Sequence, residues 1–195
     1  MAEMMKKPIT LDVNHMMADT LGFQYGIARS QVEEYAPFAA AANQAVQAGR
    51  GKNWLGWMEL PYNQAEIVDK LEKVAAKVRE KFDTFVVLGI GGSALGPIAV
   101  QQALNHLHYN ELPASKRNGP RLYVEDNIDP ERMQALLDVI DVKTTCFNVI
   151  TKSGATAETM SQYLTVSELL KKEVGDKWAE HIIATTDTEK GNLIK

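Results

Sequence analysis

The hydrophobic pattern of the chain changes near residue 83. Before it, apolar residues recur at three- and four-residue steps over residues 64–82, and a similar face with Pro37 inside it runs through residues 31–48. After it, short apolar runs alternate with amphipathic stretches. The pattern predicts an N-terminal helical arm over residues 1–82, packed on an α/β domain over residues 83–195. An aromatic segment at residues 54–61 has no clear period and is expected to help pack the arm on the domain.

Four strands are expected in the α/β part, at residues 84–89, 121–125, 145–150 and 181–185. Helices are expected at residues 96–107 and 157–172, with Pro97 at the start of the first. A third helix starts at Asp129-Pro130, because Asp is a good N-cap and Pro suits the first helical position. Alternation of this kind predicts a three-layer αβα sandwich with a parallel sheet.

Two turns rich in small and hydroxyl-bearing residues follow predicted strands and open helices. The first spans residues 89–97 and contains Gly92 and Ser93; the second spans residues 151–158 and contains Thr151, Ser153 and Thr156. Free N–H groups and a helix dipole at such turns favour an anion. Ligands of parallel sheets bind beyond the carboxyl ends of the strands, where both turns fall. The two turns together predict one phosphate held from two sides.

Each of these residues also has a simpler interpretation. Ser93 and the Ser/Thr turn can cap the helices that follow them, and Lys152 can point to solvent instead of adding charge to the site. Glu158 stands in the first turn of a helix, where the dipole favours a carboxylate and makes it a poorer base, so it is at most an auxiliary catalytic residue.

Other ligands fit the first turn less well. Gly89, Gly91 and Ala94 satisfy a loose dinucleotide pattern, but the acid that should follow about 20 residues on appears only at Glu125. A P-loop is excluded because no Gly-Lys-Ser/Thr closes the turn. His106 and His108 do not share a helical face, so no metal pair is expected.

Composition excludes further classes of protein and of binding partner. The formal net charge of −4 and the lack of a basic block argue against a nucleic-acid partner. The single cysteine, Cys146, lies in an apolar run and is expected to be a buried, inert thiol. No segment reaches the roughly 18 apolar residues of a membrane helix. With no signal-peptide pattern either, we expect a cytoplasmic protein without a membrane partner.

At these turns the chain resembles the bacterial glucose-6-phosphate isomerases. The resemblance rests on residues 89–97 and 152–159, and on the aromatic segment at residues 54–61. It implies a flavodoxin-like sugar-isomerase (SIS) domain, with substrate phosphate contacted by Gly92, Ser93, Thr151, Lys152, Ser153 and Thr156. Ala155 and Ala157 stand where such enzymes usually have threonine, so two hydroxyls of the pattern are missing.

The resemblance also implies an activity. Members interconvert glucose 6-phosphate and fructose 6-phosphate without metal or cofactor, and the family is usually dimeric. They are more than twice as long as this chain, and their acid–base residues lie beyond its matching part. We therefore expect a fragment that binds sugar phosphate but is inactive alone. The alternative is a free-standing SIS domain that senses phosphosugars without catalysis.

Overall fold

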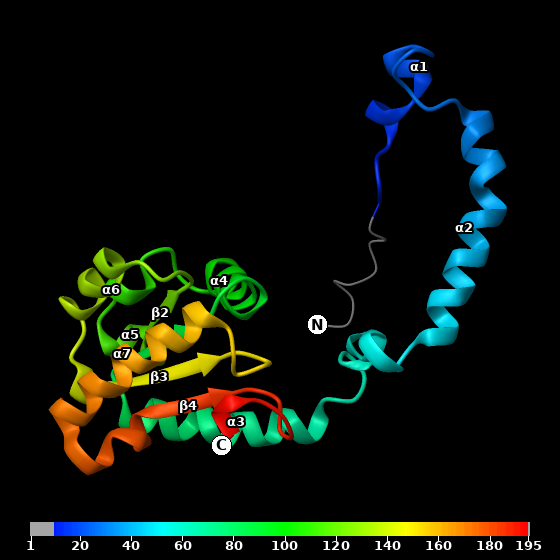
Figure 1. The fold of residues 1–195 in the computed structure, drawn as a ribbon. Helices are drawn as coiled ribbons and strands as arrows, with labels where there is room; N and C mark the ends of the chain where they lie inside the picture. The colour runs from blue at the N-terminus through cyan, green and yellow to red at the C-terminus, as the bar shows by residue number, and fades with distance from the viewer. Residues whose placement is uncertain (1–9, 195) are drawn as a thin grey trace. The chain divides into compact units, whose positions relative to one another are not determined.

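The computed structural model describes residues 10–194, so the first nine residues of the predicted arm lie outside it. The chain divides into two compact units, residues 1–66 and 67–195 (Figure 1). Helix α3 (Ala65–Lys81) therefore belongs almost entirely to the second unit, although the sequence pattern assigned it to the arm. The packing of an arm on the domain stays a prediction.

The first unit is helical and buries little of its own apolar surface. It contains η1 (Asn14–Met16), α1 (Ala18–Leu21), α2 (Arg29–Gly49) and η2 (Asn53–Glu59). Helix α2 runs without interruption past Pro37, and Gln31 accepts a hydrogen bond from the N–H of Ala28 at its start. Trp54 of η2 is 88% exposed, so this unit does not bury the aromatic segment by itself.

The second unit is built on a four-stranded parallel sheet. Its strands are β1 (Thr84–Leu88), β2 (Arg121–Glu125), β3 (Thr145–Ile150) and β4 (Ile182–Thr185), in the spatial order β2-β1-β3-β4. β1 pairs with β2 on one side and with β3 on the other, so that Leu88 lies beside both Glu125 and Val149. The strand β1 is thus central, and its carboxyl end lies between those of β2 and β3.

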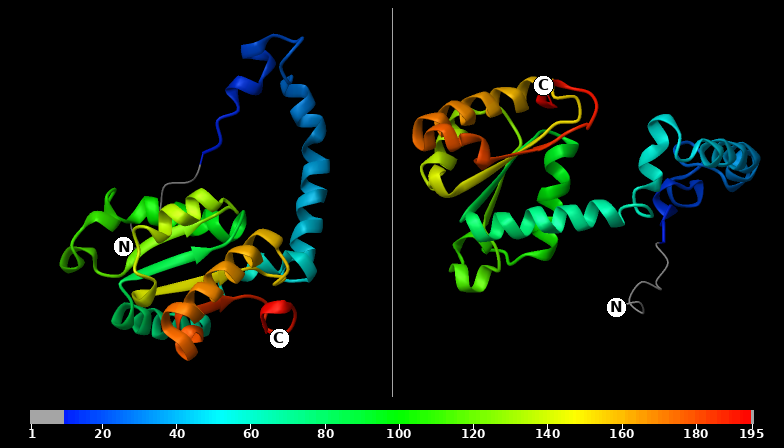
Figure 2. Two further views of the ribbon diagram at one scale, coloured as in Figure 1. Left: turned by 60° about the vertical axis from the view of Figure 1, so that its left-hand side comes forward. Right: turned by 90° about the horizontal axis from the view of Figure 1, so that it is seen from below.

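Helices cover both faces of this sheet (Figure 2). Helices α6 (Pro130–Leu137) and α7 (Ala157–Val174) lie on one face, and α3 and α4 (Gly92–Leu104) on the other. The short helix α5 (Ala114–Arg117) lies between α4 and β2 in the sequence. Right-handed crossovers require this arrangement, because β1 connects to β2 in one direction and β3 connects to β4 in the other. The predicted three-layer α/β fold is confirmed.

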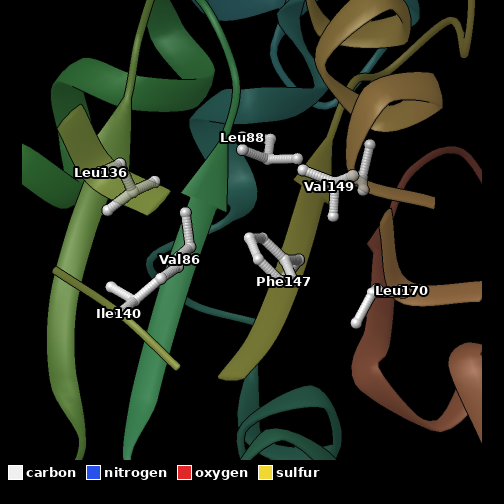
Figure 3. Packing of buried hydrophobic residues seen from close by; sticks show 8 residues of the cluster. Val86, Leu88, Leu136, Ile140, Phe147, Val149 and Leu170 are labelled. Atoms are coloured by element: carbon white, nitrogen blue, oxygen red, sulfur yellow. The ribbon is translucent and has the colours of Figure 1, made fainter. Parts of the chain in front are cut away.

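The main core lies between the sheet and α6 and α7 (Figure 3). Alternate residues of β1 and β3 point into it, and α7 contributes Val166 and Leu170. Its buried residues are Val86, Leu88, Leu136, Ile140, Phe147, Val149, Val166 and Leu170. A smaller cluster on the other face joins Val78 and Phe82 to Cys146. Both faces are therefore apolar, as the continuous strand runs require.

The sequence pattern misplaced the start of one helix. α4 begins at Gly92, four residues before the predicted start, and Pro97 lies inside it rather than at its beginning. The reason is the backbone of Gly91, whose φ of 56° turns the chain directly from β1 into the helix. Pro97, the sixth residue of α4, donates no hydrogen bond to the carbonyl of Ser93, and its ring crowds that carbonyl. Ser93 is thus a helical residue.

One further expectation concerns the burial of Cys146. Cys146 is 1% exposed, and burial raises the pKa of its thiol to about 12, which fits an inert thiol. His181 is also buried, and its Nδ1 lies 2.9 Å from the carbonyl oxygen of Thr145 at the amino ends of the strands. Among residues 10–194, no helix is both long and apolar enough to cross a membrane.

Leu170 and Leu164 of α7 differ strongly in burial, and substituting each of them tests the packing of the core. Leu170 is fully buried and Leu164 is 58% exposed. We expect Leu170→Ala to lower the free energy of unfolding by about 2–5 kcal/mol, through lost apolar burial and a cavity. Leu164→Ala, on the same helix, should change it by less than about 0.5 kcal/mol. Urea unfolding of both variants measures the difference, and equal losses would contradict the packing described.

Candidate functional site

The two predicted turns follow adjacent strands, at the point where the chain connections of the sheet change direction. β1 and β3 are adjacent and parallel, and α4 leaves β1 toward one face of the sheet while α7 leaves β3 toward the other. The crevice at such a switch point is the general ligand site of open parallel sheets. Neighbouring strands lie about 4.8 Å apart, so the first turn and the second start side by side. Ser93 is in the first turn of α4 and Thr156 is the N-cap residue of α7, so the two residues come from helices on opposite faces of the sheet.

The first turn is compact because Gly89 has no side chain. A Cβ at Gly89 would lie 2.9 Å from the Cβ of Ser93, closer than real contacts allow. The N–H of Gly89 donates to the carbonyl oxygen of Glu125 at 3.2 Å, which fixes the beginning of the turn against the end of β2. The close approach of Ser93 to Gly89 and the hydrogen bond of Gly89 hold Ser93 next to the end of β1.

Ser93 does not cap α4. The N-cap residue is Gly91, which has no side chain to serve as a cap, and Ser93 is the second residue of the helix. The backbone N–H of Ser93 donates to the carbonyl oxygen of Ile90 at 3.2 Å, and that of Ala94 to Gly91 at 3.1 Å. With its amide engaged in the turn, Ser93 has its hydroxyl to offer a ligand.

The second turn pairs two threonine hydroxyls. The Oγ1 atoms of Thr151 and Thr156 lie 3.1 Å apart, and Thr156 is the N-cap residue of α7 without a side-chain cap bond. Thr151 is 2% exposed and Thr156 is half-buried. If the Thr151 hydroxyl donates to Oγ1 of Thr156, the hydroxyl proton of Thr156 remains available to donate to a ligand. Ser153 accepts from the N–H of Ala155 at 3.2 Å and keeps its own proton.

The loop after β4 closes over the second turn. Gly154 has a φ of 62°, and a Cβ there would lie 2.6 Å from the backbone nitrogen of Asn192. A Cβ at Gly191 would lie 2.7 Å from the carbonyl oxygen of Ser153. The Thr186 hydroxyl also donates to the carbonyl oxygen of Thr151 at 2.7 Å. Two backbones therefore touch where only glycine fits.

Charge around the second turn is modest. The Lys152 side chain is exposed, and Glu158 lies half-buried in the first turn of α7. Two backbone N–H groups, those of Glu189 and Lys190, hold the pKa of Asp187 below its usual value. An anion here would thus depend on N–H and hydroxyl donors, with Lys152 the cation within this turn.

A buried carboxyl group lies at the end of β2. Burial raises the pKa of Glu125, and Arg132, whose Nε lies 3.3 Å from its Oε2, works against that rise. Arg132 also contacts Asp126 at 3.1 Å. One guanidinium is therefore shared by two acids beside the first turn.

Two cavities lie away from the two turns. One of about 480 Å³ is lined by residues around His106–Glu111, and one of about 270 Å³ lies between α6 and α7. Neither is lined by any of the six residues predicted to bind phosphate: Gly92, Ser93, Thr151, Lys152, Ser153 and Thr156. Across the described residues 10–194, no three His, Cys, Asp or Glu side chains are grouped to hold a metal ion.

Several residues around the turns had no sequence signal. Thr186 and Gly191 contact the second turn only because β4 runs beside β3, and Gln162 reaches the end of β2 from α7. Lys190-Gly191-Asn192 is polar and rich in turn formers, which predicts a loop but not its partner. The sequence pattern does not predict these contacts, because they join segments that are far apart in the chain.

The architecture is that of a doubly wound α/β protein, in which both turns lie at the switch point of the sheet. Its family is shown by sequence: the model of the family described as phosphoglucose isomerase matches residues 66–193. The chain belongs to this family.

Similar proteins agree with that assignment. Glucose-6-phosphate isomerase of Carboxydothermus hydrogenoformans is 55% identical over 167 residues, which cover 86% of this chain and 36% of the relative. That of Rubrobacter xylanophilus is 40% identical, covering 93% of this chain and 41% of the relative. The chain thus spans about two fifths or less of the length of these relatives.

Solved structures resemble the chain in fold. A hypothetical protein of Thermus thermophilus has a TM-score of 0.65 at 34% identity, over 84% of this chain and 37% of its own. A glucose-6-phosphate isomerase of Chlamydia trachomatis has a TM-score of 0.50 at 31% identity, over 64% of this chain and 22% of its own.

Gly154 and Gly96 offer a matched pair of glycine substitutions. We expect Gly154→Ala to destabilise the protein by about 1–3 kcal/mol, because Cβ meets backbone atoms and the left-handed conformation is strained. Gly96→Ala adds its carbon to open space, but Gly96 precedes Pro97 and a Cβ before a proline is disfavoured in a helix, which offsets the gain in helix propensity; the stability should change by less than about 0.5 kcal/mol. Thermal unfolding compares the two. A Gly154→Ala variant as stable as the parent would argue against the packing of the second turn.

Proposed function

We propose that the crevice between the two turns binds the phosphate group of a sugar phosphate. The observation that carries the proposal is the position of the turns at the carboxyl ends of adjacent strands, each opening a helix of more than twelve residues. Both helix dipoles then favour negative charge at the same place. Gly92, Ser93, Thr151, Lys152, Ser153 and Thr156 are the proposed ligands.

The chemistry of these donors suits a phosphate monoester. Such a group carries about −1.5 to −2 charge near neutral pH and offers strong acceptor oxygens. Hydroxyl and amide donors to a charged group contribute about 1.5–3 kcal/mol each. Four or five such bonds, less the cost of immobilising a small ligand, give an affinity between about micromolar and millimolar.

The proposed activity of the whole protein is that named for its relatives, the isomerisation of glucose 6-phosphate to fructose 6-phosphate. In it, the phosphate anchors the sugar while an acid–base group moves a proton between two neighbouring carbons. The described residues supply the anchor, and Glu158 is at most an auxiliary group. The isolated chain is expected to bind substrate and not to turn it over. We further propose a homodimer and a cytoplasmic location.

A titration of the 195-residue chain tests the binding proposal. Fructose 6-phosphate and inorganic phosphate should both shift the backbone amide resonances of Gly92, Ser93 and Thr156, because both carry the anion. Fructose without phosphate should leave those resonances unchanged. NAD serves as the control for the dinucleotide alternative and should shift none of them. Shifts with NAD and none with either phosphate would overturn the assignment.

Thr156 is the residue whose substitution isolates one hydroxyl. Thr156→Val keeps the shape of the side chain and should raise the Kd for fructose 6-phosphate about tenfold or more, from the loss of one bond to a charged group. Thr165→Val, on the exposed part of the same helix, is the matched control and should change the Kd less than twofold. In the whole enzyme the same loss should appear in KM, since the phosphate is held in ground and transition states alike. A fall in kcat with KM intact would contradict a binding role.

A further inference from the structure

The carbonyl oxygen of Glu125 is shared by the two halves of the proposed site. The N–H of Gly89, where the first turn begins, donates to it at 3.2 Å. The side-chain Nε2 of Gln162, on α7, donates to the same oxygen at 3.3 Å and to the carbonyl oxygen of Asn127 at 2.9 Å. One backbone oxygen thus links the first turn to the helix that carries the second.

Gln162 reaches this oxygen from across the sheet. α7 follows β3, whereas Glu125 ends β2, and the order β2-β1-β3 puts β1 between them. Gln162 is 4% exposed, so its carboxamide makes both hydrogen bonds away from solvent. A buried carboxamide in this position acts as a fixed tie between α7 and the end of β2.

Both protons of the Gln162 amide nitrogen are used in this tie. An amide NH₂ group has two donors, and here each meets one backbone carbonyl. An apolar side chain at this position would leave the Asn127 carbonyl without that donor and would free the first turns of α7 to shift. A site that holds an anion from two sides depends on a fixed separation between its halves.

We propose that Gln162 is a positioning residue, which fixes the N-terminus of α7 and its turn relative to the turn after β1 without touching the ligand. This inference rests on the proposed function, because it assigns Gln162 to the phosphate site defined there. Its effect should appear in anion affinity rather than in the stability of the sheet alone.

Gln162→Met removes the donor at nearly constant volume, and Gln101→Met is the matched control. Gln101 also donates from a helix to a β2 carbonyl, that of Leu122 at 3.3 Å, but near the far end of α4. With sulfate as the probe, we expect Gln162→Met to raise the Kd about fivefold and Gln101→Met to raise it less than twofold. Urea unfolding of both variants separates affinity from stability.

A second measurement uses the free proteins. Gln162→Met should shift the amide resonance of Gly89, which shares the Glu125 oxygen, and speed its hydrogen exchange; Gln101→Met should do neither. Where Gln162→Met does not fold, Gln162→Asn replaces it, because its shorter amide cannot span both carbonyls; the same loss of affinity is expected.

The outcomes separate the two proposals. If the parent chain binds sulfate but Gln162→Met and Gln101→Met bind it equally well, the positioning role is wrong and the binding site stands. If the parent binds neither sulfate nor fructose 6-phosphate, the proposed function fails and the role of Gln162 fails with it. A raised Kd for Gln162→Met alone, with the Gly89 amide shifted, supports both.

Discussion

The rest of the structure depends on one constraint, the adjacency of β1 and β3 with chain paths that leave them in opposite directions. Right-handed crossovers then send α4 and α7 to different faces of the sheet. Both helices start at the same edge of the sheet, at the carboxyl ends of adjacent strands. The apolar packing beneath, from Leu88 and Val149 on the α7 side, keeps the two strand ends in register.

The phosphate site proposed at this edge would rely on dipoles and hydroxyls more than on formal charge. The chain is acidic overall, and Arg132 is already engaged by Glu125 and Asp126. Lys152 is exposed, where a single charge is screened by solvent. A phosphate would therefore be recognised chiefly by the geometry of its donors, which explains why so many contacts in this region fix backbone positions.

The fold was largely predictable, and the arrangement of the site only partly so. The four strands follow from continuous apolar runs, and three of them begin at the predicted residue. The start of α4 was misplaced because the prediction treated Pro97 as a residue at the beginning of the helix. The positive φ of Gly91, which sets the actual start, cannot be inferred from a hydrophobic pattern. The hydroxyl-rich turns were evident from sequence. The Gly154–Asn192 approach and the reach of Gln162 were not, since both join segments far apart in the chain.

The contact between Gly154 and the loop around Gly191 has a consequence for how the protein matures. Gly154 precedes Asn192, which lies against it, by 38 residues, so a nascent chain exposes the second turn before its covering loop has been synthesised. The second turn therefore reaches its final surroundings only once β4 has paired with β3.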